Sequence, residues 1–416
     1  MSFLHTQESY SMNLTTVKEA TTIILNNSVN FGIEEVDFIN SVGRVLKEDI
    51  VADRDFPPFN RVSMDGIAIA EEAFNKGIRS FKIEGIQAAG SPQLTLKNTN
   101  NCIEAMTGAM LPINSDVVIQ YELLEIKDGF ATVNLDTVKS FQNIHKKGLD
   151  RKQNDVLIPK NTLISAAEIG VFATVGKSKV KVAKQPKVII VSTGNELVEV
   201  SETPAEYQIR RSNVYTLVSL LENLQIKADT AHILDDKKTL ETKIASFLNE
   251  YDVLLFSGAV SKGKFDFIPE VLDNLDVEKL FHKVKQRPGK PFWFGKKTVV
   301  ERSRSAKTVF AFPGNPVSTF VSCLKYFYPW YNKSIGLNFE NKQEAVLSED
   351  FYFKPNLTYF LQVKLQQENG KLIATPIAGK GSGDLTNLVD SDAFLELPDD
   401  NSNFTKGQVF PLLTFR

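Results

Sequence analysis

Carboxylates follow several short apolar runs in this chain, where they could hold a metal ion. Glu196 follows KVIIVS, Asp235 and Asp236 follow AHIL, and Asp266 ends the loop SGAVSKGKFD after DVLLFS. Hard divalent cations such as Mg²⁺ prefer carboxylate oxygens. Mg²⁺ is therefore the first candidate for any metal held by Glu196, Asp235, Asp236 and Asp266. Taken alone, each of these acids is more typical of a helix cap or a solvated surface.

Glycine and hydroxyl residues in two of these loops could bind an anion, because backbone N–H groups at the start of a helix attract negative charge. Turns between strands and helices also use glycine for steric reasons alone, and this alternative stays open. The candidate residues are Thr193 and Gly194 after KVIIVS, and Ser257, Gly258, Ser261 and Gly263 in the loop after DVLLFS.

Two rigid turns add candidates for binding phosphate or another tetrahedral oxyanion. The segment RPGKP carries Arg287 and Lys290 on a turn with two prolines, and cationic side chains of this kind bind such anions well. In the second turn, which follows TVFAF, prolines fix φ on both sides of a Gly-Asn pair. A surface turn and a helix start are the alternative interpretations. The second turn consists of Pro313, Gly314, Asn315 and Pro316.

The amino-terminal half carries further candidate residues in three short segments. Asp65 lies among apolar and small residues in PPFNRVSMDGIAI, and an acid in such surroundings needs a partner or a function. The same question, whether the residue has a function or only a structural partner, applies to Thr107 and Gly108 in MTGAMLP and to Asp150 in KKGLD. A capped tight turn explains these segments equally well.

The elements around the first set of loops predict a parallel sheet. Between residues 187 and 331, the apolar runs KVIIVS, DVLLFS, TVFAF and the weaker IKADTAHI alternate with segments of helical periodicity. This alternation is typical of a doubly wound α/β domain. Ligands bind beyond the carboxyl ends of such strands, so we expect the loops to share one edge of the sheet.

The remaining segments predict a multidomain α/β chain. Residues 14–52 and 148–183 favour an N-terminal helical and linking domain, with residues 14–52 read as helical and Ser165 as a helix cap. Short runs rich in β-forming residues predict an inserted β-rich domain over 53–147. The parallel-sheet domain spans 184–332, and 333–416 predict a C-terminal all-β domain. The basic stretch KKTVVERSRSAK favours an exposed hairpin over a binding patch.

Composition narrows the class of protein. The length of 416 residues exceeds what one hydrophobic core usually serves, and the net charge of −2 offers no field for gathering nucleic acid. Only two cysteines, Cys102 and Cys323, argue against a disulfide framework or a thiolate metal site. No stretch approaches the ~20 apolar residues of a membrane span, and no signal-peptide pattern occurs. We expect a cytoplasmic protein with a small-molecule partner.

Taken in order, these motifs resemble the molybdopterin molybdenumtransferase family, the MoeA-type proteins that include the carboxy-terminal domain of gephyrin. The resemblance extends from about residue 14 to residue 397. It rests on PPFNRVSMDGIAI, MTGAMLP with NSDVVIQYE, KKGLD, DVLIPKNTLISAAEIG, STGNEL, RRSNVYTL, SGAVSKGKFD, RPGKPFWFG, FPGNPVS and GKGSGDL.

The resemblance implies a homodimer of four-part subunits, with an α/β domain of the molybdopterin-binding type. It implies an active cleft between this domain of one subunit and the β-rich insertion of its mate. It also implies molybdate and adenylated molybdopterin as substrates, Mg²⁺ as cofactor, and a transient contact with molybdopterin adenylyltransferase. By matching position, Asp65, Asp150, Glu196 and Asp266 are catalytic, Asp235 joins Glu196 and Asp266 on the metal, and Thr107, Lys290, Pro313, Pro316, Ser318 and Ser382 bind substrate.

The chain departs from the family pattern at four positions. Ala259 stands where the family usually has a second glycine, and Leu149 replaces a common Glu. Asn195 stands for a common Asp, and Arg287 for a common Lys. None of these changes removes a predicted catalytic acid, so we expect an active enzyme whose pterin-phosphate loop differs in detail.

Two other functions compete with molybdenum insertion. A dimeric scaffold with a peptide groove is compatible with the gephyrin resemblance, but the retained carboxylates and the lack of a fused domain disfavour it. A molybdopterin adenylyltransferase is compatible with the SGAVS segment, but the β-rich insertion and the terminal domain disfavour it.

Overall fold

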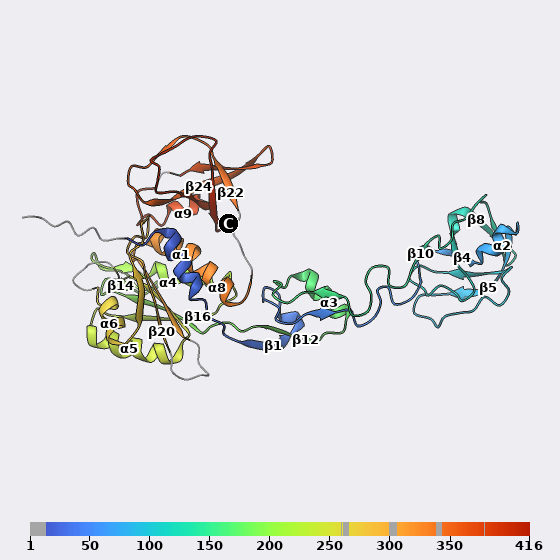
Figure 1. Ribbon diagram of the computed structural model, residues 1–416, viewed down its shortest axis with the longest axis horizontal. Coiled ribbons are helices and arrows are strands. Elements are labelled where there is room, and N and C mark those ends of the chain that lie inside the picture. The colour runs from blue at the N-terminus through green and yellow to red at the C-terminus, as the bar shows by residue number, and fades with distance from the viewer. Residues whose placement is uncertain (1–13, 259, 261–265, 299–305, 338–342, 378) are drawn as a thin grey trace, which may run out of the picture. The chain divides into compact units, whose positions relative to one another are not determined.

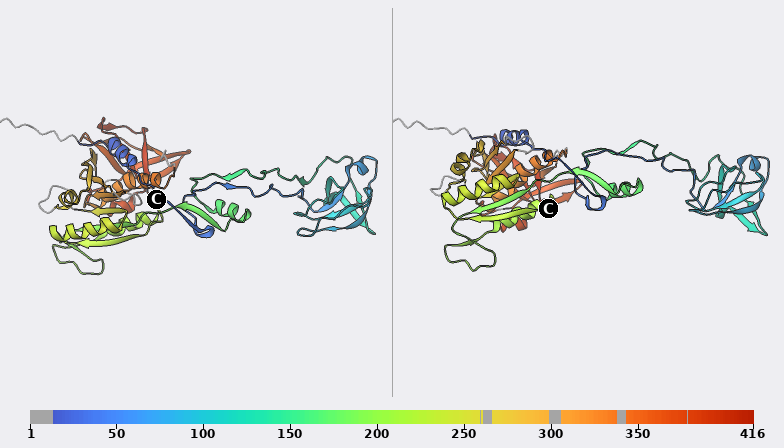
Figure 2. Two further views of the ribbon diagram at one scale, coloured as in Figure 1. Left: turned by 60° about the horizontal axis from the view of Figure 1, so that its bottom comes forward. Right: turned by 90° about the horizontal axis from the view of Figure 1, so that it is seen from below.

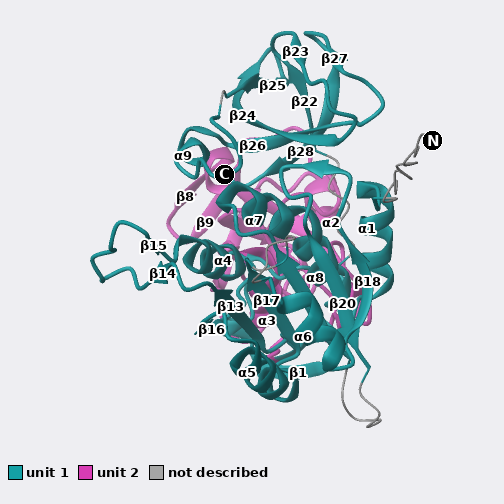
Figure 3. Cartoon of the chain, turned by 90° about the vertical axis from the view of Figure 1, so that its left-hand side faces the viewer, with its two compact units in different colours: residues 1–47, 161–165, 180–416 teal, residues 48–160, 166–179 magenta. Residues whose placement is uncertain are grey.

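The computed structural model describes residues 14–258, 260, 266–298, 306–337, 343–377 and 379–416. These residues form two compact units (Figure 3). Unit 1 contains residues 1–47, 161–165 and 180–416, and unit 2 contains 48–160 and 166–179. The four-part division expected from the sequence stays a prediction. In the described part of the chain, no helix is both long and apolar enough to cross a membrane.

A six-stranded sheet forms the centre of unit 1, in the order β16-β13-β17-β21-β20-β18. The first four strands are parallel, which confirms the expectation for the four apolar runs. The last two are antiparallel, so the sheet is mixed. The connection from β20 to β21 is too short for a parallel crossover, which needs about a dozen residues. The strands are β13 (Val188–Thr193), β16 (Ala228–Ile233), β17 (Val253–Ser257), β18 (Glu278–His282), β20 (Trp293–Lys297) and β21 (Lys307–Phe312).

Both faces of this sheet are buried under helices. Along β13, Val188 and Ile190 pack into one apolar core, whereas Ile189 and Val191 pack into another. The first core includes apolar residues of α1 (Val17–Asn26), α4, α7 and α8, and the second includes those of α5 and α6. Figure 1 labels α1, α4, α5, α6 and α8 among the helices of this unit. The helices are α4 (Ser212–Glu222), α5 (Lys237–Glu250), α6 (Ile268–Asn274), α7 (Pro316–Ser322) and α8 (Tyr328–Ser334), with a π-helical turn, η3 (Cys323–Phe327), between the last two.

The amino-terminal segment is helical over a shorter range than the sequence predicts. Helix α1 (Val17–Asn26) begins with a capping box between Thr16 and Glu19. The chain then turns at Gly32, whose φ is +93°, and continues as strand β1 (Ile33–Asp37), which pairs with β12 (Lys179–Ala183). The expectation of helix over residues 14–52 is therefore wrong beyond Asn26, because the IEEVD segment alternates as a strand does.

The carboxy-terminal part of unit 1 is a second six-stranded sheet, in the order β19-β24-β25-β22-β28-β26. Its edge strand β19 (Gln286–Arg287) comes from the α/β segment, and Gln286 pairs with Thr358 of β24. The turn after β19 is thus anchored to both parts of the unit. The other elements of this part are β22 (Glu344–Leu347), β23 (Phe351–Tyr352), β24 (Thr358–Glu368), β25 (Lys371–Pro376), α9 (Asn387–Asp390), β26 (Ala393–Leu397), β27 (Asn403–Phe404) and β28 (Val409–Thr414). The α/β segment also contains a two-stranded ribbon, in which β14 (Leu197–Val198) pairs with β15 (Ile209–Arg210).

Unit 2 contains a third six-stranded sheet, in the order β7-β4-β6-β5-β9-β8, which confirms the predicted β-rich character of 53–147. Figure 2 shows these strands in blue to teal from two directions. Helix α3 (Ala166–Thr174) begins directly after Ser165, as expected. The other elements of unit 2 are β2 (Ile50–Val51), β3 (Arg61–Val62), β4 (Gly66–Ile69), α2 (Glu71–Asn75), β5 (Ser80–Gln87), β6 (Cys102–Ala105), β7 (Val117–Gln120), the short 3-10 turn η2 (Tyr121–Leu123), β8 (Leu124–Lys127), β9 (Phe130–Val133), β10 (Ile144–His145) and β11 (Val156–Ile158). A second 3-10 turn, η1 (Phe38–Asn40), belongs to unit 1.

Gly66→Ala tests the packing of the sheet in unit 2. A Cβ on Gly66 would lie 1.9 Å from the carbonyl oxygen of Ile119 on β7, so the strands must separate. We expect unit 2 to lose about 1–3 kcal/mol of stability, as for other overpacked sites. Hydrogen–deuterium exchange of peptides covering β4 and β7 measures this loss.

Gly170→Ala is the matched control in the same unit. Gly170 lies in α3, and nothing stands within 4 Å of the position of its Cβ. Alanine there removes chain entropy from the unfolded state and stabilises the helix by roughly 0.5–1 kcal/mol. Equal exchange rates in the Gly66→Ala and Gly170→Ala variants would contradict the packing described for β4 and β7.

Candidate functional site

The carboxyl ends of three parallel strands bring the predicted loops together. In the register of the sheet, Ser192 pairs with Ser257, and Ser257 pairs with Phe312. The loops after β13, β17 and β21 therefore begin at one edge, as expected. The N–H of Gly258 donates to the carbonyl oxygen of Phe312 at 3.1 Å, so two of these loops are also joined directly.

Asn213, at the start of α4, ties this edge together. Its Nδ2 donates to Ser257 Oγ at 3.0 Å and to the carbonyl oxygen of Gly314 at 2.7 Å. One side chain thus holds the loop after β17 beside the loop after β21. Sequence reasoning did not select Asn213, although it lies in the RRSNVYTL motif. Its hydrogen bonds span 44 and 101 residues of chain, which local patterns do not reveal.

A cavity of about 580 Å³, here called the Glu196 cavity, opens at this edge. Many of the predicted residues, from three different loops, line this cavity. Thr193 Oγ1 and Asn213 Oδ1 are buried there without a hydrogen-bond partner among the described residues, which is costly unless a ligand or water supplies one. The lining includes Thr193, Glu196, Arg211, Asn213, Ser257, Gly258, Pro313, Gly314, Asn315 and Pro316.

Gly194 is required by the position of the Glu196 carboxylate. Its φ is +138°, and a Cβ at this position would lie 2.5 Å from Glu196 Oε2. The carboxylate therefore folds back over the turn that follows β13. A larger residue at position 194 would displace Glu196, so Gly194 serves the site through its lack of a side chain.

Three predicted metal ligands interact electrostatically. Burial is the largest cause of a raised pKa at Asp235, and the negative charges of Glu196 and Asp266 raise that pKa further. Glu196 and Asp266 each lie close enough to Asp235 to affect its charge. Among the described residues, however, no group of three acidic, histidine or cysteine side chains has the spacing of a formed metal site. The donors suit a hard cation, but they are not assembled around one.

Asp236 has a structural role. Its carboxylate accepts a hydrogen bond from the N–H of Thr239 at 2.8 Å and caps α5. Hydrogen bonds from the Thr239 hydroxyl and from its N–H lower the pKa of Asp236. The alternative of a helix cap is therefore correct for this acid.

A second cavity, also about 580 Å³ and here called the Lys290 cavity, lies beside the first. Lys290, Arg287 and Lys380 bring three cationic side chains to its lining, and none of its described lining residues is acidic. The sequence did not single out Lys380, although it stands in the GKGSGDL motif. The lining also includes Pro313, Asn315, Ser318 and Ser382.

The two cavities share part of their wall. Pro291, Pro313 and Asn315 line both of them. Asn315 Nδ2 also donates to Ser382 Oγ at 2.7 Å, so the loop after β21 is fastened to the carboxy-terminal part of the unit. A ligand in one cavity would therefore lie next to a ligand in the other.

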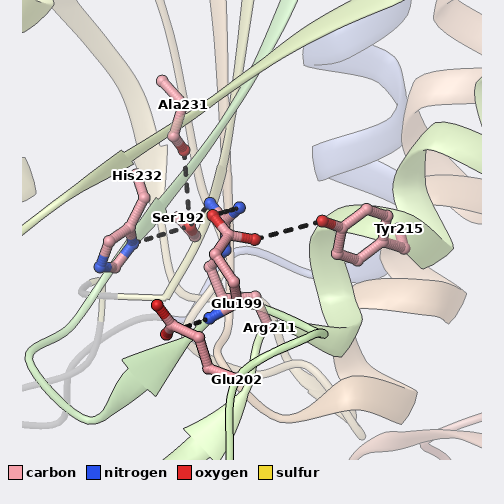
Figure 4. Close-up of polar contacts among 7 residues, drawn as sticks. All are labelled: Ser192, Glu199, Glu202, Arg211, Tyr215, Ala231 and His232. Carbon is pink, nitrogen blue, oxygen red and sulfur yellow. Dashed lines mark hydrogen bonds and ion pairs between the residues drawn. The ribbon is translucent and has the colours of Figure 1, made fainter.

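Buried Arg211, which also lines the Glu196 cavity, is the centre of a polar network at the end of β13 (Figure 4). The Arg211 guanidinium donates to Glu199 and to Ser192 Oγ, and Tyr215 on α4 also donates to Glu199. The hydrogen bond from Arg211 lowers the pKa of Glu199. Burial lowers the pKa of His232, and the nearby guanidinium of Arg211 lowers it further. This network fixes the β14–β15 ribbon beside the end of β13.

Two predicted acids belong to unit 2. The N–H of Thr107 donates to Asp65 Oδ1 at 2.6 Å, and this hydrogen bond lowers the pKa of the exposed Asp65 carboxyl. The turn that presents this N–H includes Gly108, whose φ is +84°. Asp150 contacts His145 Nε2 at 2.9 Å, a partner that the sequence did not indicate. Both acids are held in place by specific contacts.

The predicted residues of unit 1 that line the Glu196 and Lys290 cavities lie together at one edge of the sheet. Asp235 and Asp266 lie near enough to influence each other, as described above. Ser261 and Gly263, with the Ala259 departure, lie outside the described residues. Asp65, Thr107, Gly108 and Asp150 belong to unit 2.

Comparisons with known proteins match nearly the whole chain. A family model of the MoeA N-terminal region, domains I and II, matches residues 15–176. A model of a probable molybdopterin-binding domain matches 189–333, and a model of the MoeA C-terminal region, domain IV, matches 344–415. The three regions occur in the order that the sequence motifs indicated.

Individual relatives agree with these models. The molybdopterin molybdenumtransferase of Synechocystis is 40% identical, over 95% of this chain and 98% of its own length. That of Staphylococcus epidermidis is 29% identical, over 95% and 94%. A crystal structure of the molybdopterin biosynthesis MoeA protein from Pyrococcus horikoshii superposes with a TM-score of 0.81 at 29% identity, covering 97% of this chain and all of the other. The chain therefore belongs to the MoeA family, whose curated relatives are named molybdopterin molybdenumtransferase.

Proposed function

We propose that the protein inserts molybdate into adenylated molybdopterin and releases AMP. The observation that carries this proposal is the pair of adjoining cavities, which meet at Pro291, Pro313 and Asn315. Insertion requires an oxyanion and a dithiolate side by side, and holding two reactants together removes much of the entropic barrier. Two neighbouring cavities of different chemical character serve this purpose.

The Lys290 cavity is the proposed molybdate site. Molybdate is a tetrahedral dianion, so its binding needs cations and hydrogen-bond donors. Lys290, Arg287 and Lys380 supply positive charge, and Ser318 and Ser382 supply hydroxyl groups. Rigid prolines in both turns keep the loss of entropy on binding small.

The Glu196 cavity is the proposed site of the adenylated pterin. Buried atoms without partners, Thr193 Oγ1 and Asn213 Oδ1, favour a polar ligand there. Gly258, with a φ of +104°, ends β17 without a side chain and allows the backbone to approach a phosphate. The Glu196 carboxylate is the group in this cavity that can orient an attacking water.

Mg²⁺ is the proposed cofactor for cleavage of the adenylate. Glu196, Asp235 and Asp266 would hold it, because their mutual repulsion, which raises the pKa of Asp235, would be offset by a divalent cation. When bound, the ion would neutralise charge that develops on the phosphoryl oxygens. The carboxylates themselves would position the ion.

We also propose a homodimer, as the family resemblance implies. Asp65 and Asp150 are then the acids that one subunit contributes to the cleft of its partner. A cytoplasmic location, and a transient contact with a molybdopterin adenylyltransferase that hands over the adenylate, complete the proposal. The two buried cysteines, Cys102 and Cys323, are free thiols and support a reducing compartment.

Removing the charge of either proposed catalytic acid will slow insertion. Glu196→Gln and Asp65→Asn each keep the size of the side chain, and we expect conversion of adenylated molybdopterin to fall by roughly a hundredfold or more. Reconstitution of an apo-molybdoenzyme measures the product. Glu206→Gln and Asp128→Asn, at exposed acids in units 1 and 2, are matched controls that keep wild-type conversion. Full conversion by both active-site variants would refute the assigned roles.

Withdrawal of Mg²⁺ will stop release of AMP. In protein treated with a chelator, we expect AMP formation to cease and to return when Mg²⁺ is added. Asp235→Asn removes one proposed ligand and is expected to raise the Mg²⁺ concentration for half-maximal rate by roughly tenfold or more. AMP is measured by chromatography. Undiminished AMP release in excess chelator would contradict a role for the ion.

Mixed dimers will test whether the active cleft takes acids from two subunits. When Asp65→Asn and Glu196→Gln chains are refolded together, half of the dimers are mixed, and each mixed dimer has one intact cleft. Activity is then expected to recover to about a quarter of the wild-type value, from near zero for either variant alone. No recovery, in mixtures shown by mass spectrometry to contain mixed dimers, would mean that both acids act within one subunit.

A further inference from the structure

A buried amide and a buried phenol lie beneath the turn that carries Lys290. Gln286 and Tyr326 are 0% and 1% exposed. The hydroxyl of Tyr326 donates to Gln286 Oε1, and Gln286 Nε2 donates to the carbonyl oxygen of Pro288 at 3.0 Å. The hydroxyl of Tyr326 thus fixes the amide group of Gln286, and this amide group in turn holds the backbone at Pro288.

The turn lies directly on this polar layer. Gly289 has a φ of +93°, and a Cβ there would lie 2.6 Å from Gln286 Nε2 and 2.9 Å from Ser322 Oγ. Only glycine lets the backbone come this close. The carbonyl oxygen of Lys290 accepts hydrogen bonds from the N–H groups of Val284 and Phe292, both at 2.9 Å. The backbone of the turn is therefore fixed along its length, while its cationic side chains stay exposed.

The phenol is a dependable donor in this position. Burial raises the pKa of Tyr326 well above its ordinary value, so the hydroxyl keeps its proton. The ring stacks on Phe292, with centroids 4.8 Å apart, which restricts the direction of the hydroxyl. With Oε1 occupied by Tyr326, the amide group of Gln286 must direct its Nε2 toward Pro288. A buried amide left without these partners would be costly.

We propose that Tyr326 and Gln286 are positioning residues for oxyanion binding. They hold the RPGKP turn so that Lys290 and Arg287 direct their charges into the Lys290 cavity. Gln286 itself also lines that cavity, whereas Tyr326 does not and acts only through Gln286. This inference rests on the proposed role of the cavity as the molybdate site. It adds that the buried residues beneath the turn determine the affinity for the oxyanion.

The test compares two tyrosines whose hydroxyl groups both make hydrogen bonds within the fold. Tyr326→Phe removes the donor to Gln286. Tyr328→Phe removes a hydroxyl that donates at 2.6 Å to the carbonyl oxygen of Leu220, away from the cavity. Calorimetry with tungstate, a stable tetrahedral dianion, gives the Kd of each protein. We expect Tyr326→Phe to raise the Kd by roughly tenfold, equivalent to about 1.4 kcal/mol, and Tyr328→Phe to leave it unchanged.

Gln286→Met provides a second variant of similar volume, which removes both hydrogen bonds of the amide. It is also expected to raise the Kd for tungstate. The Kd for the adenylated pterin is the control, because a general loss of structure would raise it too. We expect this Kd to keep its wild-type value in both variants. Weakened pterin binding together with weakened tungstate binding would overturn the positioning role.

Lys290→Ala separates failure of this inference from failure of the proposed function. If wild-type protein binds no tungstate, or if Lys290→Ala binds it as tightly as wild type does, the proposed oxyanion site is wrong and the inference falls with it. If Lys290→Ala weakens binding while Tyr326→Phe and Gln286→Met bind like wild type, only the positioning role is overturned.

Discussion

Backbone hydrogen bonds between β13, β17 and β21 determine where the loops of the site begin. Because Ser192, Ser257 and Phe312 share one line across the sheet, the chain must leave the three strands at the same edge. Apolar residues on both faces of the sheet keep this register, since a slip of one residue would turn each core side chain to the wrong face. Every contact of the Glu196 cavity depends on that alignment.

The site joins two kinds of electrostatic environment across a single loop. On one side of Pro313 and Asn315, cations gather around the Lys290 cavity, and on the other side lies Glu196, with Asp235 and Asp266 near it. Arg210 and Arg211 also line the Glu196 cavity, so charges of both signs meet there, whereas the described lining of the Lys290 cavity carries no acid. The rigid prolines keep the wall thin and fixed.

The sequence was sufficient to predict the parts of the fold that repeat a simple pattern. Continuous apolar runs predicted the four parallel strands, and charged or glycine-bearing turns predicted Glu196, Gly258 and Lys290 at the cavities. It was not sufficient for features that depend on distant partners. The antiparallel edge of the sheet and the strand β1 depend on pairing, and their sequences fit more than one structure.

The polar supports of the site were also beyond sequence reasoning. Asn213 bridges loops 44 and 101 residues away, and Tyr326 reaches Gln286 across 40 residues. Neither residue type at these positions differs from what an ordinary helix would carry. Their roles appear only when the fold has brought the partners together and removed water from them.

The proposed function depends above all on binding of a tetrahedral oxyanion in the Lys290 cavity beside the Glu196 cavity. A crystal structure of the full chain soaked with tungstate tests it most directly, because tungsten gives a strong anomalous signal. We expect an anomalous peak within hydrogen-bonding reach of Lys290 and Ser382, and no such peak in Lys290→Ala crystals. Tungstate bound only at other surfaces, with the Lys290 cavity open to solvent, would contradict it.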